Sequence, residues 1–198
     1  QIFESLDELH ECRTLGRHDK SLTSAEFSPD GRRILTASSG NAKVWDWEAG
    51  RLLIDVATQG PEDTRVYTLY FARYSFDGRV FITAFRDTVQ IRDAETGSLL
   101  QTLQGRRAYL SGDDRRIATR SFDGKTRVYD VRSGTLLLSF GPAKEDLDAH
   151  PTSRQDLKYT RFSPDGRLLG DLSAGGIFYL RDSETGEVRH RLDHPPNV

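Results

Sequence analysis

One phrase recurs four times along the chain and limits what it can fold into. Each copy is a short β-branched or aromatic run that ends in aspartate, followed four residues later by glycine: VWDWEAG, QIRDAETG, RVYDVRSG and YLRDSETG. A second marker precedes each copy: FSPDGR, YSFDGR, LSGDDR and FSPDGR. The aspartates of the two markers are 16, 16, 17 and 17 residues apart, whereas 31, 20 and 35 residues separate one unit from the next. This constancy within units and variation between them predict a structural repeat with surface connections of different length.

The residues of each unit predict antiparallel strands joined by tight turns. In SPDG, proline presets the second turn position, aspartate suits the third, and glycine supplies the positive φ that follows. In D-x-x-x-G, the aspartate can accept hydrogen bonds from turn amides and the glycine takes the left-handed conformation. The runs AKVW, TVQI, TRVY and IFYL between the turns are typical of strands. No segment keeps a helical periodicity.

Four-stranded units with a period of about 40 residues predict the blades of a β-propeller. Each sheet would have two apolar faces and bury them against its neighbours, so the blades stack around an axis. The expected fold class is all-β, with about four complete blades and half of a preceding one. An ordinary β-sandwich is the alternative, and four in-register copies of both markers argue against it. The expected boundaries are a half-blade at 1–17 and blades at 18–57, 58–104, 105–141 and 142–194.

The VWD of Val44–Asp46, the FSPDG turns and the D-x-x-x-G closures resemble the WD-repeat (β-transducin-like) family of propellers. The resemblance covers nearly the whole chain. It implies a non-catalytic scaffold that docks other proteins or neighbouring domains of its own chain. It also implies a buried hydrogen-bond network in the best blades, made by a loop histidine, a Ser or Thr, a turn aspartate and a third-strand tryptophan.

No blade of this chain carries all four members of that network. The first has His18, Thr36 and Trp45, but SSGN lacks the aspartate; the third has tyrosine for tryptophan and no histidine. In the second and fourth blades, Arg92 and Arg181 replace the tryptophan. Because an incompletely satisfied polar network stabilises little, we expect apolar packing to hold the blades. The two arginines should extend over that packing towards solvent.

Composition limits the partners and the compartment. The 28 basic and 30 acidic residues leave a net charge of −2, which gives no electrostatic reason to expect nucleic acid or an anionic membrane. The single cysteine, Cys12, cannot form an internal disulfide and fits a reducing compartment, so we expect a cytoplasmic protein. The absence of methionine predicts a segment of a larger multidomain protein. Such a partial ring would have open edges that can self-associate edge to edge.

The search for chemistry gives no catalytic, cofactor or metal site. The sequence has no nucleophile elbow, P-loop or dinucleotide fingerprint. Four scattered residues could be imagined as metal ligands but lack the spacing of zinc sites: His10, Cys12, His190 and His194. The carboxylate pairs Asp113–Asp114 and Glu62–Asp63 are interpreted as solvated turn formers. The arginine doublets alternate with acidic residues and are interpreted as ordinary charged surface.

The connections between blades are the expected binding surface. They vary in length, share one face of a propeller, and are loops on a rigid scaffold. The candidate partner-binding residues are Arg17, His18, Glu62, Asp63, Arg65, Arg106, Arg107, Lys144, Glu145, Asp146 and Asp148. We therefore expect a protein-interaction scaffold. The alternative is a propeller enzyme with its active site at the central channel, which requires convergent ionisable residues with perturbed pKa values near the axis.

Overall fold

The computed structural model describes residues 14–57, 69–121, 123–141, 159–172 and 177–193. Within these ranges every helix or strand is a β-strand, and the strands form four sheets of four. The first sheet holds β1 (Leu22–Phe27), β2 (Arg33–Ser38), β3 (Asn41–Asp46) and β4 (Arg51–Ala57). The second holds β5 (Leu69–Tyr74), β6 (Val80–Phe85), β7 (Thr88–Asp93) and β8 (Leu99–Gln104). The third holds β9 (Arg107–Leu110), β10 (Arg116–Arg120), β11 (Thr126–Asp130) and β12 (Leu136–Phe140). The fourth holds β13 (Tyr159–Phe162), β14 (Leu168–Leu172), β15 (Phe178–Asp182) and β16 (Val188–Leu192).

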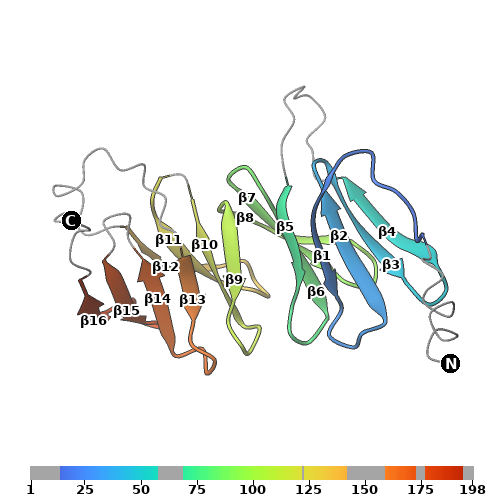
Figure 1. Ribbon diagram of the computed structural model, residues 1–198. Coiled ribbons are helices and arrows are strands. Elements are labelled where there is room, and N and C mark those ends of the chain that lie inside the picture. Colours follow the sequence, from blue (N-terminus) through green and yellow to red (C-terminus); the bar gives the residue numbers. More distant parts are fainter. Residues whose placement is uncertain (1–13, 58–68, 122, 142–158, 173–176, 194–198) are drawn as a thin grey trace, which may run out of the picture.

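The sheets are antiparallel meanders that stand side by side in one row (Figure 1). The first strand of each sheet is an edge strand, and these four strands lie along the same side of the row: β1, β5, β9 and β13. We call them the inner strands. The row does not close in the described residues, because the first and fourth sheets lie at its opposite ends. The all-β, blade-like fold is thus confirmed. Each sheet lies within one of the four expected blade spans. Of the expected half-blade, residues 1–13 lie outside the described residues, and residues 14–17 form no strand.

The SPDG turn connects the first and second strands of a sheet by the predicted chemistry. In the first sheet, the Gly31 N–H donates to the carbonyl of Ser28 at 2.8 Å, and Gly31 has a φ of 72°. The Ser28 hydroxyl donates to Asp30 Oδ1 at 2.6 Å. This bond, followed by one from the Arg32 amide, holds the pKa of Asp30 below its usual value. The third sheet has Asp114 at the glycine position, with a φ of 56°.

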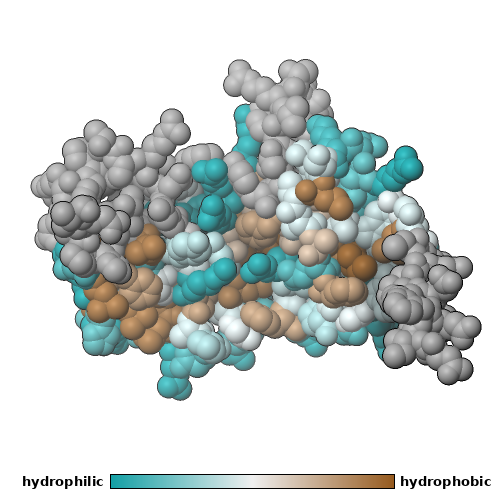
Figure 2. Space-filling model, in the orientation of Figure 1, coloured by the Kyte–Doolittle hydropathy of each residue, from teal (hydrophilic) through white to brown (hydrophobic). Residues whose placement is uncertain are grey.

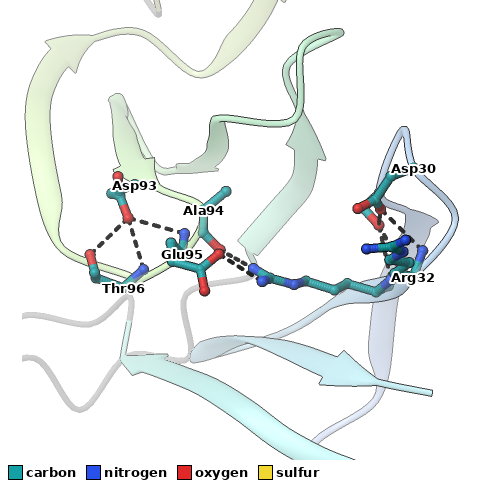
Figure 3. Close-up of polar contacts among 8 residues, drawn as sticks. Asp30, Arg32, Asp93, Ala94, Glu95 and Thr96 are labelled. Atoms are coloured by element: carbon teal, nitrogen blue, oxygen red, sulfur yellow. Dashed lines mark hydrogen bonds and ion pairs between the residues drawn. The ribbon is translucent and has the colours of Figure 1, made fainter. Parts of the chain in front are cut away.

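The D-x-x-x-G turn connects the third and fourth strands and is also as predicted. Asp182 Oδ1 accepts the amides of Glu184 and Thr185, each at 3.0 Å, and Gly186 has a φ of 75°. The Thr185 and Glu184 amides, with the Arg189 guanidinium, lower the pKa of Asp182 to about 2. The same turn at Asp93 is drawn in Figure 3. These local bonds fix the position of the turn between the third and fourth strands of each sheet.

Apolar side chains between adjacent sheets form the core. The second and third strands of each sheet supply most of it, as the central strands of a sheet with two covered faces should. Its largest fully buried aliphatic and aromatic side chains are Phe81, Leu35, Ile82, Ile91, Ile117 and Leu169. One cluster joins the first and second sheets and another joins the second and third. The buried cluster between the third and fourth sheets is smaller, with Ala118, Val128 and Leu169.

The expected course of Arg92 and Arg181 towards solvent is wrong. Both guanidinium groups turn back into the D-x-x-x-G turn of their own sheet: Arg92 donates to the Gly97 carbonyl at 3.0 Å and Arg181 to that of Gly186 at 3.2 Å. Arg181 is buried, and its guanidinium carbon lies 4.5 Å from the centre of the Phe140 ring of the third sheet. Burial lowers the pKa of Arg92. Each cation thus has a turn carbonyl as a partner, together with the Gln90 side-chain oxygen for Arg92 and an aromatic face for Arg181.

Polar ties between neighbouring sheets accompany the apolar core. Arg33 of β2 donates to the Ala94 carbonyl at 2.9 Å and pairs with Glu95 at 2.7 Å (Figure 3). Ser24 and Glu26 of β1 accept the edge amides of Ala72 and Tyr74 on β5. An amide at a strand edge is thus satisfied by a side chain of the next sheet, which blocks its pairing with another chain.

Asp114 and Arg116 were interpreted from the sequence as solvated surface residues, and this interpretation is wrong, because both bind an adjacent sheet. Asp114 of the third sheet accepts the amides of Phe76 and Asp77 in the turn of the second, at 3.1 and 2.8 Å. Burial is the main cause of its raised pKa. Arg116 reaches the fourth sheet, where it donates to Ser183 Oγ at 2.8 Å and to the Gly166 carbonyl at 2.9 Å. Both side chains therefore hold adjacent sheets in register.

Candidate functional site

The inner strands and the turns after them line an open groove of about 660 Å³. The turn residues in its wall are Pro29, Phe76, Gly112 and Pro164. Figure 2 shows apolar surface running across this side of the molecule, interrupted by hydrophilic side chains. Phe76 is 67% exposed. The groove therefore offers a ligand both apolar area and a few polar groups, the composition usual for binding sites.

Four side chains of the groove occupy one register position. Glu26, Arg73, Tyr109 and Arg161 are each the penultimate residue of an inner strand. They form two pairs across sheet boundaries. Arg73 Nε lies 3.5 Å from Glu26 Oε2, and the Arg161 guanidinium carbon lies 4.2 Å from the centre of the Tyr109 ring. We call these four residues the inner row.

The inner row has one positive charge in excess. Glu26 uses one oxygen for the Tyr74 amide, at 3.0 Å, and the other for Arg73. Arg161 is exposed, and no described carboxylate lies within ion-pair distance of it. Its contact with Tyr109 is a cation–π interaction, which leaves the N–H groups at the edge of the guanidinium plane open.

The other ionisable groups of the groove bear on the enzyme alternative. The described lining residues contain no histidine and no aspartate. Tyr74 also lines the groove, and burial raises its pKa to about 12. Its hydroxyl is buried without a hydrogen-bond partner. A phenol with a pKa raised this far stays protonated near neutral pH, so Tyr74 is not poised as a base.

His18, predicted to contact a partner, is part of a hydrogen-bond network within the first sheet. Its Nε2 lies 2.7 Å from Thr36 Oγ1, which also accepts the indole N–H of Trp45 at 2.7 Å. Its Nδ1 lies 2.9 Å from Asn41 Oδ1 and 2.9 Å from Ser38 Oγ. Asn41 takes the place of the missing aspartate, so the expectation of a blade held by apolar packing alone is wrong for this sheet.

The direction of the bonds in this network follows from Asn41. Its amide nitrogen donates to Asp55 Oδ1 at 3.0 Å, so its oxygen faces the imidazole. A carbonyl oxygen only accepts, and Nδ1 of His18 therefore donates. With the proton on Nδ1, Nε2 accepts from the Thr36 hydroxyl, which in turn accepts from Trp45. Both ring nitrogens of His18 are thus engaged inside the sheet.

The remaining predicted partner residues divide into two groups. Arg17 and Arg107 are exposed, and Arg106, half-buried, donates its amide to the Arg120 carbonyl at 2.5 Å. None of these three residues lines the groove, although Arg107 is the first residue of β9, whose other residues do. The others lie outside the described residues: Glu62, Asp63, Arg65, Lys144, Glu145, Asp146 and Asp148. Their role in binding stays a prediction.

Sequence reasoning missed the inner row. A signal was available, because each of its members stands two residues before the serine of the SPDG-type marker. The residue types differ from copy to copy, however, as Glu, Arg, Tyr and Arg. A search for recurring residues passes over such a position. Only the side-by-side packing of the sheets brings the four side chains to one surface.

The described part of the chain adds two findings on metal and membrane. No three of its His, Cys, Asp or Glu side chains are placed to hold a metal ion together. Of the four residues considered as metal ligands from the sequence, only His190 lies within the described residues, on the exposed strand β16. None of the elements in the described ranges is a helix with the length and hydrophobicity that crossing a membrane requires.

A known repeat family matches part of the chain. The sequence model of the WD domain, G-beta repeat, matches residues 10–46, a span that includes β1, β2 and β3. No curated protein gives a significant match to the chain. The match falls on the sheet that has the histidine–threonine–tryptophan network, and the other sheets repeat its topology. The resemblance to WD-repeat propellers is therefore confirmed, and repeats of this kind build domains that generally mediate protein–protein interactions.

Proposed function

We propose that the chain is a non-catalytic docking module within a larger cytoplasmic multidomain protein, and that partner segments bind in the inner groove. One observation carries the proposal. Four sheets tied to one another hold, in the wall of one groove, an exposed aromatic ring, Phe76, and a cation, Arg161, that has no carboxylate partner in the described residues. A rigid frame with adaptable polar groups at its surface is how binding sites are commonly built.

Site-specific photo-crosslinking tests the groove. A benzophenone amino acid at position 76 should trap partner proteins in an extract of the cells that make the protein. The control carries the same group at position 137 on β12, where Leu137 is also exposed but lies outside the groove. Partners trapped at position 76 and absent at position 137 support the proposal. The same set of products at both positions, or none at either, overturns docking in the groove.

The connections predicted from the sequence form a second arm of this test. Deletion of residues 142–156, or charge reversal at Arg17 and Arg107, should leave crosslinking at position 76 unchanged if the groove is the docking surface. If no partner is crosslinked at position 76 and deletion of residues 142–156 abolishes partner binding, the docking surface is the connections and not the groove. The scaffold function would then stand with a different surface.

A further inference from the structure

We propose that the groove recognises one acidic residue of an extended partner segment, whose carboxylate binds Arg161 while an adjacent large apolar side chain lies against Phe76. This inference rests on the proposed function and names the chemistry of the partner. Both residues line the same groove, as do Pro164 and Leu110, which supply further apolar surface. The partner segment is defined by one negative charge beside a hydrophobic side chain.

Arg161 is held ready for a carboxylate. The ring of Tyr109 supports one face of its guanidinium plane, at 4.2 Å, and limits the motion of a long side chain. The N–H groups at the edge of that plane form a fork that matches the two oxygens of a carboxylate. A side chain oriented in advance loses less entropy on binding. A lysine would keep the charge here but would lose both the stacking and the fork.

Other arginines of the inter-sheet region show that Arg161 is distinctive. Arg73, at the same register position, is paired with Glu26, and Arg33 is paired with Glu95. Arg116 donates to a carbonyl and a hydroxyl of the fourth sheet. Among the described cations of the groove, Arg161 has an aromatic face as its partner but no acceptor. The missing acceptor is what the ligand supplies.

The charge balance limits the ligand to one carboxylate. The groove residues Glu26, Arg73 and Arg161 sum to a single positive charge. A phosphate group or an acidic run would bring more negative charge than this excess neutralises into a largely apolar groove that also contains Glu26. A polyanion is therefore a poor fit. A carboxylate flanked by apolar residues matches both the charge and the surface.

Fluorescence anisotropy with three pools of capped, labelled nonapeptides tests the inference. The central residue is fixed as glutamate, glutamine or phosphoserine, and the flanking positions carry mixed apolar residues. A bidentate pair with a charged carboxylate is stronger than the same contact with a neutral amide, so the glutamate pool should bind roughly tenfold more tightly than the glutamine pool. Equal binding of these two pools overturns the inference. Tighter binding of the phosphoserine pool also overturns it, in favour of a phosphorylated ligand.

Variants of the chain locate the effect. Arg161→Ala should abolish the preference for glutamate, and Arg161→Lys should lose most of it. Arg167→Ala is the matched control, because Arg167 is an exposed arginine in the turn of the same sheet and does not line the groove. Glu26→Gln keeps an acceptor for the Tyr74 amide but removes the acidic group, so it should tighten binding of the glutamate pool.

The outcomes separate this inference from the proposed function. If partners are crosslinked at position 76 but the glutamate and glutamine pools bind equally, the proposed docking module stands and the acidic motif is overturned. A preference that persists in Arg161→Ala, or that is lost in Arg167→Ala, places the carboxylate elsewhere and overturns the assignment. Failure of crosslinking at position 76 removes the proposed groove itself. Circular dichroism of each variant confirms that the sheets are retained.

Discussion

Replacing Asp171 with threonine should loosen the junction between the third and fourth sheets. Asp171 on β14 and Arg120 on β10 face each other there, with side chains 5% and 7% exposed and 3.7 Å between Oδ1 and the nearer guanidinium nitrogen. Thr160 also donates to Asp171, at 2.9 Å. Threonine fits the backbone at this position. The equivalent residue of the second strand, six positions after the aspartate of the SPDG-type marker, is threonine in the other three sheets. These residues are Thr36, Thr83 and Thr119.

The size of the effect follows from the charge left behind. In Asp171→Thr, Arg120 keeps its bonds to Thr126 Oγ1 and to the Gly124 carbonyl, at 2.9 and 3.0 Å, but loses the buried carboxylate of Asp171. Removal of one partner from a buried ion pair costs roughly 3–5 kcal/mol. For a chain of this length each kcal/mol corresponds to about 2–4 °C, so the melting temperature should fall by roughly 6–20 °C.

The double variant Arg120→Ala/Asp171→Thr provides the sharp control. It recreates the alanine and threonine that stand at these positions in the first two sheets. Replacement of a buried ion pair as a unit is often neutral, so the double variant should lie only about 2 kcal/mol below the parent, for the space that Arg120 leaves, and about 1–3 kcal/mol above Asp171→Thr.

Urea unfolding followed by circular dichroism gives the free energies of the variants in this cycle. Hydrogen exchange should localise the loss in Asp171→Thr to β9–β16. The reasoning is refuted if Asp171→Thr lies within about 1 kcal/mol of the parent, or if the double variant is as unstable as Asp171→Thr.

Three further predictions concern local bonds. Asn41→Ala removes one of the two oxygens within hydrogen-bond distance of His18 Nδ1, the other being Ser38 Oγ, and should cost about 1–3 kcal/mol in urea unfolding; an unchanged midpoint would contradict the network. Gly97→Ala should lower the melting temperature far more than Gly31→Ala. Both glycines have a positive φ, but the added Cβ would lie 2.6 Å from Ile54 Cγ2 at Gly97 and would meet no atom within 4 Å at Gly31. Equal losses in the two variants would rule out that contact. Asp182, with a pKa of about 2, stabilises the fold fully above the unfolded pKa of about 3.9 and loses this effect as pH falls towards 2. Asp182→Asn should therefore reduce the fall of the melting temperature between pH 4 and 2, and an unchanged slope would count against it.

The local chemistry of the two markers was sufficient to predict the strands and their turns. The Ser28–Asp30 and Asp182–Thr185 bonds join residues two or three positions apart, so the sequence pattern contains nearly all the information that forms them. The polar network of the first sheet was only partly predictable. His18, Thr36 and Trp45 matched a known pattern, but the acceptor, Asn41, is a different residue type from the expected aspartate.

The candidate site was the least predictable part. Arg73 and Glu26, like Tyr109 and Arg161, are about 50 residues apart in the chain and meet because adjacent sheets stack. No periodic or compositional signal marks a contact that different residue types make at each junction. Asp114 shows the same limit, since its partners are amides of the preceding sheet, whereas the sequence shows only a turn.

The sequence by itself determined the repeating unit, its strand order and its class, because hairpin turns and strand propensity depend on near neighbours. Tertiary structure decided which charges are buried, which face another sheet and which remain open to a ligand. Those outcomes depend on the distance between side chains of different sheets and on their removal from water, and both are set only when the sheets pack. Arg181 and Arg161 illustrate the difference: both are strand arginines of one sheet, but one is buried against Phe140 and the other is exposed beside Tyr109.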